Sequence, residues 1–151
     1  MDIHAAGARP SVRPSKDYFT GTVWQDPVVT APAPARVVAA KVSFEPGART
    51  AWHTHPLGQT LVVLSGVGLV QAKGGPIREI RAGDTVWIPP GEIHWHGANA
   101  TNGMVHLAIQ EAIDGSAVTW MQHVSDDEYG EAVSRQVEGV AGSCERRSCA
   151  S

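Results

Sequence analysis

The chain has 151 residues, of which 42% are apolar and 18% charged, and its net charge is −3; this predicts one globular domain with a hydrophobic core. The absence of a basic excess or a basic helix argues against a nucleic-acid partner. No apolar run approaches the ~20 residues that a membrane-spanning helix needs, and residues 1–10 lack the apolar core of a signal peptide. The only cysteines are Cys144 and Cys149, so the body of the domain has no disulfide framework, and we expect a cytoplasmic protein.

The chain begins with a polar segment, residues 1–20, in which two prolines favour an extended N-terminal arm. The apolar residues Val23, Trp24 and Val28–Val29 then predict an edge strand. Alternating Ala and Pro over residues 31–35 predicts a turn that ends this strand.

A period-two apolar pattern starts at Val37, where Ala40, Val42 and Phe44 share one face of a predicted strand. Short segments of the same kind, separated by Gly, Pro, Asn and Asp, predict a series of further strands. These strands are Thr60–Leu64, Gly68–Ala72, Ile77–Ile80, Thr85–Ile88, Trp95–Ala98, Met104–Gln110 and Val118–Met121. The pattern predicts an all-β fold, a single jelly-roll domain forming a barrel or sandwich over residues 21–124.

A different pattern follows this domain. Ser125 and Glu128 have the spacing of a capping box, and the residues after them predict a short amphipathic C-terminal helix over 125–138. Residues 139–151 are rich in small residues, and we expect a flexible tail there.

Polar residues interrupt the apolar pattern where two imidazoles, His53 and His55, are separated by one residue. Alternate residues of a strand point to the same face, and the predicted turn at 56–58 returns Gln59 toward them. Two imidazole nitrogens and an amide oxygen converging on one point suit a divalent metal. Histidines on a sheet face can also do no more than pack or form hydrogen bonds.

A second polar stretch follows the strand Thr85–Ile88, where Pro89-Pro90-Gly91 forms a rigid return to His94. Together the two stretches resemble the two motifs of the cupin family. The first motif matches in every spacing at Gly47, His53, His55, Gln59 and Gly66. The second matches at Gly83, Pro89, Gly91 and His94, with its asparagine displaced by one position to Asn99.

One departure from the cupin pattern concerns charge, since Gln59 stands where a glutamate is usual. Three neutral imidazoles, from His53, His55 and His94, and one neutral amide leave the full charge of a divalent cation uncancelled. We therefore expect a strongly electrophilic site with two adjacent open positions, which lowers the pKa of a bound hydroxyl. Ligand chemistry alone does not select the metal.

Two more histidines are predicted to face the interior. His106 shares the inward face of its strand with Gln110, and His96 has the same parity as His94. A buried imidazole needs a hydrogen-bond partner. His106 is therefore either a core histidine bonded to backbone or an acid/base group beside the metal.

The chain also resembles a narrower group, the small bacterial manganese-dependent hydroxynitrile lyases. The resemblance covers residues 17–129 and is carried by Ser43–Gln59, by residues 90–97 and by His106–Glu111. It implies reversible cleavage of an (R)-cyanohydrin such as mandelonitrile to an aldehyde and hydrogen cyanide.

The resemblance also implies site residues: a metal held by His53, His55, Gln59 and His94, with His106 as the acid/base. It implies that Ala40, Val42 and Gln110 form the pocket wall, to which strand parity adds His96. Mn(II) is the implied metal, and Fe(II), Zn(II) or Ni(II) are alternatives.

Other functions use the same ligands. An Fe(II)-dependent cupin dioxygenase is one alternative, although a carboxylate ligand commonly supports oxygen activation there. A non-catalytic cupin that binds a small molecule is the other alternative.

The sequence also predicts a homo-oligomer, a dimer or a tetramer, from the apolar residues Val23 and Trp24 and the proline-rich arm.

Overall fold

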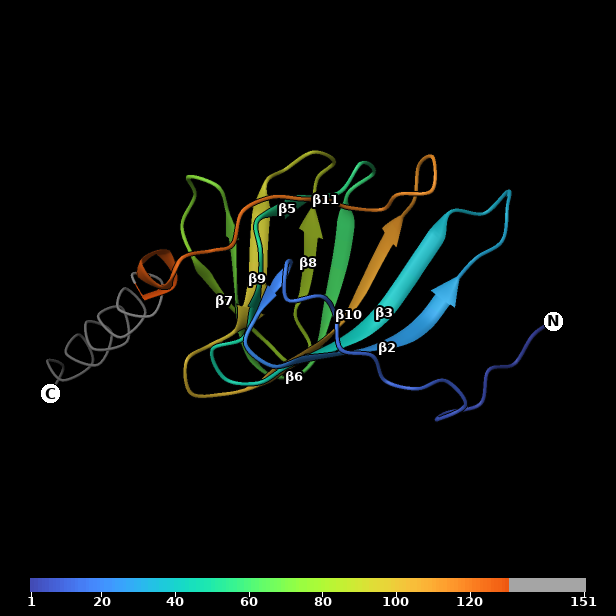
Figure 1. Cartoon of the computed structure of the whole chain (residues 1–151), viewed down its shortest axis with the longest axis horizontal. Helices are drawn as coiled ribbons and strands as arrows, with labels where there is room; N and C mark the ends of the chain where they lie inside the picture. The colour runs from blue at the N-terminus through green and yellow to red at the C-terminus, as the bar shows by residue number, and fades with distance from the viewer. Residues whose placement is uncertain (131–151) are drawn as a thin grey trace, which may run out of the picture.

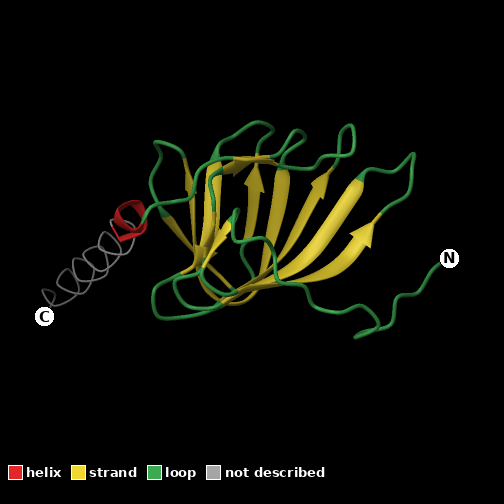
Figure 2. Ribbon diagram, viewed as in Figure 1, coloured by secondary structure: helices red, strands yellow, loops and turns green. Residues whose placement is uncertain are grey.

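The computed structural model describes residues 1–130 and has the predicted all-β architecture, with one short helix that begins at residue 126 (Figure 2). The strands are β1 (Phe19–Thr20), β2 (Val23–Thr30), β3 (Val37–Phe44), β4 (Arg49–Thr50), β5 (His53–Thr54), β6 (Gln59–Ala72), β7 (Arg78–Arg81), β8 (Thr85–Ile88), β9 (His94–Ala98), β10 (Met104–Glu111) and β11 (Thr119–Trp120).

The strands form two antiparallel sheets that share β6 (Figure 1). The first sheet contains β2, β3 and β10, and the first half of β6 pairs with β10 and β8. The second half of β6 pairs with β7 and β9 in the second sheet, where β9 also contacts β4 and β5. Strands far apart in sequence therefore curve around one interior, the arrangement of a jelly roll.

The predicted break between Thr60–Leu64 and Gly68–Ala72 is absent, because β6 runs through both segments and bends from one sheet into the other. Gly66 lies at the bend with φ of 78°, and a side chain there would collide with the carbonyl of Gly103. A glycine allows the strand to change direction without ending.

The interior of the barrel is apolar at one end. Phe44, Leu61, Val63 and Met104 are buried there, on strands β3, β6 and β10. A second cluster forms outside the barrel, where Trp52, Leu69, Trp95, Val124 and Tyr129 pack together. The polar residues that remain buried in the barrel therefore stand out against an otherwise apolar core.

The C-terminal helix is fixed to the barrel by hydrogen bonds. Ser125 and Glu128 form the predicted capping box, with Glu128 N donating to Ser125 Oγ at 3.1 Å and Ser125 N donating to Glu128 Oε2 at 2.9 Å. The buried Arg49 donates to the Val124 carbonyl and pairs with Asp126. The predicted extent of the helix beyond residue 130 and the predicted tail 139–151 lie outside the described residues.

Within residues 1–130, no helix is both long and apolar enough to cross a membrane.

Candidate metal centre

The two motifs that were separate in sequence meet in the structure. β5 and β9 pair so that His53 and His94 are directly opposite each other, and their ring centroids lie 4.2 Å apart. The turn at residues 56–58 and the loop before β9 are also joined, since Gly91 N donates to the carbonyl of His55 at 3.0 Å. The backbone thus holds three imidazoles at one place.

In each of the three rings Nδ1 lies against a backbone carbonyl, and this contact decides which nitrogen of the ring can bind a metal. Nδ1 of His53 lies 2.9 Å from the carbonyl of Ala51, Nδ1 of His94 lies 2.9 Å from that of Glu92, and Nδ1 of His55 lies 2.6 Å from that of Ala117. A carbonyl oxygen can only accept, so each Nδ1 carries the hydrogen and each Nε2 keeps its lone pair. Pinning Nδ1 in this way is how proteins orient histidine ligands toward a metal.

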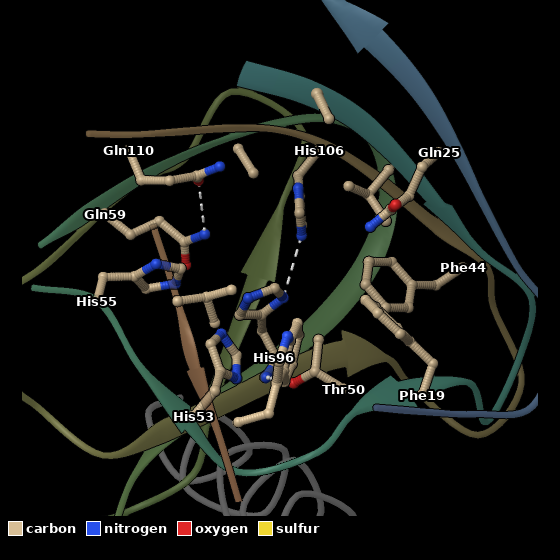
Figure 3. A pocket seen from close by; sticks show the side chains of 15 residues that line it. Phe19, Gln25, Phe44, Thr50, His53, His55, Gln59, His96, His106 and Gln110 are labelled. Atoms are coloured by element: carbon tan, nitrogen blue, oxygen red, sulfur yellow. Dashed lines mark hydrogen bonds between the residues drawn. The ribbon is translucent and has the colours of Figure 1, made fainter. Parts of the chain in front are cut away.

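Gln59 completes the set, and its orientation is also fixed. Its Nε2 donates to Oε1 of Gln110 at 3.0 Å (Figure 3). Its Oε1 therefore turns toward His94, whose Nε2 lies 3.4 Å away. The amide therefore presents its oxygen, the atom that ligates a metal, to the three imidazoles. The four predicted ligands lie together.

The site also passes a test of fit for a divalent metal. Nε2 of His55 is buried without a hydrogen-bond partner among the described residues, and leaving such a group unsatisfied costs about 1–3 kcal/mol. A cation at this place would satisfy it. The ligand atoms of His53, His94 and His96 all lie within 4.8 Å of one another, which places His96 next to the predicted ligands.

Burial keeps these imidazoles neutral. It lowers the pKa of His94 to about 4 and, together with the nearby ring of His94, holds the pKa of His53 well below its usual range. Burial also lowers the pKa of His55. Only the neutral imidazole can bind a metal, so all three rings are ready to do so at neutral pH.

His106 and His96 form a hydrogen-bonded pair beside this centre. Nε2 of His106 lies 3.1 Å from Nδ1 of His96 (Figure 3), and burial lowers the pKa of His106 to about 4. A β-bulge in the β6–β10 pairing falls next to His106, and bulges of this kind can re-aim a side chain. This contact is compatible with both interpretations of His106, a core histidine and an acid/base group beside the metal.

A cavity of about 140 Å³ opens beside the histidines (Figure 3). The predicted wall residues Ala40, Val42, His96 and Gln110 line it, together with His53, His55, Gln59 and His106. His94 is not among the lining residues. Its ring packs against that of His53, and it lines a separate pocket together with Trp87 and Glu92.

Sequence reasoning missed several residues that line the cavity. These are Phe19, Gln25, Phe44, Thr50, Ala108, Val118 and Trp120. Phe19 lies in the part of the chain predicted as an arm, but it pairs with Thr50 as β1. Phe44 and Ala108 carried a signal, since each has the inward parity of an identified neighbour on its strand. Trp120 carried none, because its place depends on pairing with His53 across β11 and β5.

A jelly roll with an interior cluster of histidines of this kind defines a cupin with a metal centre. The cupin domain model matches residues 40–109, and the chain belongs to the cupin family.

Two relatives are similar over nearly the whole domain. An (R)-mandelonitrile lyase from Granulicella tundricola is 58% identical over 129 residues, which is 85% of this chain and 98% of that protein. A cupin-like protein from Thermotoga maritima, known from its crystal structure, is 40% identical with a TM-score of 0.76 and covers 87% of this chain and 97% of its own.

A more distant structure, the polyketide cyclase RemF from Streptomyces resistomycificus, has a TM-score of 0.67. It is 18% identical and covers 85% of this chain and 90% of its own. At that identity the likeness shows the fold alone.

Proposed function

We propose that this cupin is a metal-dependent hydroxynitrile lyase, an enzyme that reversibly cleaves (R)-cyanohydrins such as mandelonitrile to an aldehyde and hydrogen cyanide. The observation that carries the proposal is the 58% identity to an (R)-mandelonitrile lyase along almost its entire length. The interior cluster of His53, His94 and His96, which includes two of the predicted ligands, supports the metal dependence.

His53, His55, Gln59 and His94 would hold the metal. Each of the three imidazoles has its Nδ1 against a backbone carbonyl, which leaves the lone pair of its Nε2 free, and Oε1 of Gln59 lies 3.4 Å from Nε2 of His94. When bound there, a divalent metal would supply a Lewis acid that stabilises negative charge developing on the substrate. Ala40 and Val42 line the cavity with small side chains and would leave room for the phenyl ring of mandelonitrile.

His106 would serve the proton transfer. Cleavage moves the hydroxyl proton to cyanide, and a neutral imidazole can take up and return that proton. His106 is buried and faces the cavity, and its Nε2 is in contact with His96. Burial excludes bulk water as the competing proton carrier at this place.

Three further features belong to the same proposal. The metal is Mn(II), on the resemblance of the site segments to manganese-dependent lyases. The protein is a homo-oligomer. Val23, which was predicted to face a partner, is buried in the core instead, but Trp24, Leu64 and Trp87 are 41%, 49% and 60% exposed on strands of one sheet, where a partner chain would cover them. Light scattering tests this. The location of the protein is cytoplasmic, in keeping with the absence of cysteine from residues 1–143.

The proposed function is tested by incubating the purified protein with racemic mandelonitrile. We expect benzaldehyde and cyanide to form in equal amounts, with consumption of the R enantiomer and loss of turnover after treatment with a chelator. Oxygen consumption without cyanide release would instead support the Fe(II) dioxygenase. Binding of the substrate without any turnover would support a binding module.

A prediction follows for the amide ligand. Gln59→Glu is expected to keep the metal, because a carboxylate also binds divalent cations, and Gln110 can turn its amide to donate to the new oxygen. The added negative charge weakens the electrophilic character of the site. Turnover of mandelonitrile should therefore fall several-fold more than metal occupancy, as measured by elemental analysis of the same sample. An unchanged rate at full occupancy would remove the argument from charge.

A further inference from the structure

The cavity wall contains one polar side chain, besides the histidines, that has no hydrogen-bond partner among residues 1–130, and it belongs to Gln25. The other polar lining residues are engaged. Gln59 donates to Gln110 at 3.0 Å, and Thr50 Oγ1 accepts from the backbone N–H of His96 at 3.2 Å. An amide that can both donate and accept is therefore left without a partner at the wall of the cavity.

The backbone of Gln25 is held firmly although its side chain has no partner. Its N–H donates to the carbonyl of Val12 at 2.9 Å and its carbonyl accepts from Val12 N at 2.8 Å, while β2 pairs with β3 on the other side. The neighbouring Trp24 faces outward beneath the guanidinium of Arg13, 4.9 Å from its ring. Adjacent residues of a strand point to opposite faces, so Gln25 points inward, and Figure 3 shows its amide turned into the cavity beside Phe44.

The position of Gln25 in the sheet places it far from the metal ligands. Val42 of β3 pairs with Gln25 on one side and with His106 on the other, so the three residues form one row across β2, β3 and β10. Two strand spacings, about 10 Å, separate the backbones of Gln25 and His106. Gln59 lies one strand further on, in β6, and Figure 3 shows Gln25 and Gln59 on opposite sides of the cavity. A substrate group that contacts Gln25 is therefore the one farthest from the metal ligands.

Aromatic rings line the cavity between these two sides. The ring of Trp120 packs against that of His53 with centroids 4.7 Å apart. Phe19 meets Trp120 edge-on at 5.4 Å, and Phe44 lies 6.4 Å from Phe19. Trp120, Phe19 and Phe44 all line the cavity, and a wall of this kind favours an aromatic ring in the ligand. The wall begins at a metal ligand and leads toward the amide of Gln25.

The chemistry of this amide indicates what the far end of the ring carries. An unsubstituted phenyl group offers an amide no partner, whereas a phenolic hydroxyl both donates and accepts and so matches Oε1 and Nε2 of Gln25. A charged substituent would need an opposite charge when it is buried. No Asp, Glu, Lys or Arg is among the lining residues of this cavity, so a neutral hydroxyl fits better than a carboxylate or an ammonium group.

We propose that Gln25 is a specificity-determining residue that binds a hydroxyl group on the aromatic ring of the substrate, opposite the carbon that carries the nitrile. The preferred substrates are then aromatic cyanohydrins with a 4-hydroxyl group. This inference rests on the proposed lyase function and names the substrate class of that site.

The test compares two substrates of similar size in the metal-loaded enzyme, (R)-4-hydroxymandelonitrile and (R)-4-methylmandelonitrile, with the spontaneous rate subtracted. Gln25→Met keeps an unbranched side chain and removes both polar atoms. Gln122→Met is the matched control, because Gln122 is exposed and lies outside the cavity. The readout is the ratio of kcat/KM for the hydroxyl substrate to kcat/KM for the methyl substrate, since a general loss of folding or of metal cancels in this ratio.

We expect the wild type and Gln122→Met to prefer the hydroxyl substrate, and Gln25→Met to lower the ratio roughly tenfold, mainly through KM, as the loss of one hydrogen bond predicts. A ratio in Gln25→Met within about twofold of wild type would overturn the inference. Cleavage of (R)-mandelonitrile by the wild type without cleavage of either substituted substrate would also overturn it, because the far side of the cavity would then not admit a ring substituent.

A second measurement does not depend on turnover. Calorimetric titration of the metal-loaded protein with 4-hydroxybenzyl alcohol and 4-methylbenzyl alcohol measures binding of compounds that have no cyanide to release. We expect the hydroxyl compound to bind more tightly to the wild type and to lose this advantage in Gln25→Met. The absence of a difference between the two alcohols in the wild type would overturn the inference. Failure of the wild type to cleave (R)-mandelonitrile would instead reject the proposed function, and the two titrations would still decide whether Gln25 binds a ring hydroxyl.

Discussion

Replacing any one of His53, His55 and His94 by alanine is expected to lower metal affinity by more than about 100-fold and to abolish turnover. Losing only a partner that orients a metal ligand costs about 10–100-fold in affinity, and losing the ligand itself should cost more. Each of these rings has its Nδ1 held against a backbone carbonyl, so the two ligand rings that remain cannot rotate to replace the lost one. Elemental analysis after gel filtration, together with a mandelonitrile assay, measures both effects.

The matched control for these variants is His123→Ala, since His123 is exposed and contacts Thr20 outside the cavity. This variant should keep the metal and the activity of the wild type. Wild-type metal content in all three ligand variants would show that the metal binds elsewhere.

The second large effect concerns His106. His106→Ala is expected to keep near-normal metal content and to lose roughly 10²–10⁴-fold in turnover. The ring is fully buried and contacts His96, and none of its nitrogens is pinned to a neighbouring carbonyl as the ligand rings are. Turnover per bound metal, measured with the melting temperature on one preparation, separates the loss of proton transfer from a loss of stability.

A purely structural role for His106 gives the opposite pattern. Removing a buried ring leaves a cavity beside Phe44 and would lower the melting temperature, while the rate per bound metal would stay close to that of wild type. Such a result would move His106 from the proton path to the core.

The sequence predicted the strands of the jelly roll well where the alternation of apolar residues was regular. It failed at β6, because Gly66 looks like a turn residue in isolation, and only pairing with β9 and β10 shows that the chain continues as one strand. The short strand β1 was missed for a similar reason. Its two residues carry no periodicity, and their pairing with Arg49 and Thr50 is a tertiary contact.

The residues of the site also fall into those whose positions the sequence predicts and those whose positions only the tertiary structure shows. The proximity of His53, His55, Gln59 and His94 could be predicted from motif spacing, because the connections within each motif are short. The contact of His96 with His106 could not be predicted, since parity placed His96 only in the cavity wall. Its contact with His106 depends on the pairing of β9 and β10 through β6, which brings the two rings to 3.1 Å.

The central claim, that this cupin cleaves cyanohydrins with a metal held by the interior histidines, is tested most directly by one titration. Protein stripped of metal is reconstituted with increasing Mn(II), and bound metal and (R)-mandelonitrile turnover are measured on each sample. We predict that turnover is absent without metal and rises in proportion to occupancy up to one metal per chain. Turnover that is independent of occupancy, or no turnover of either enantiomer at full occupancy, would contradict the claim.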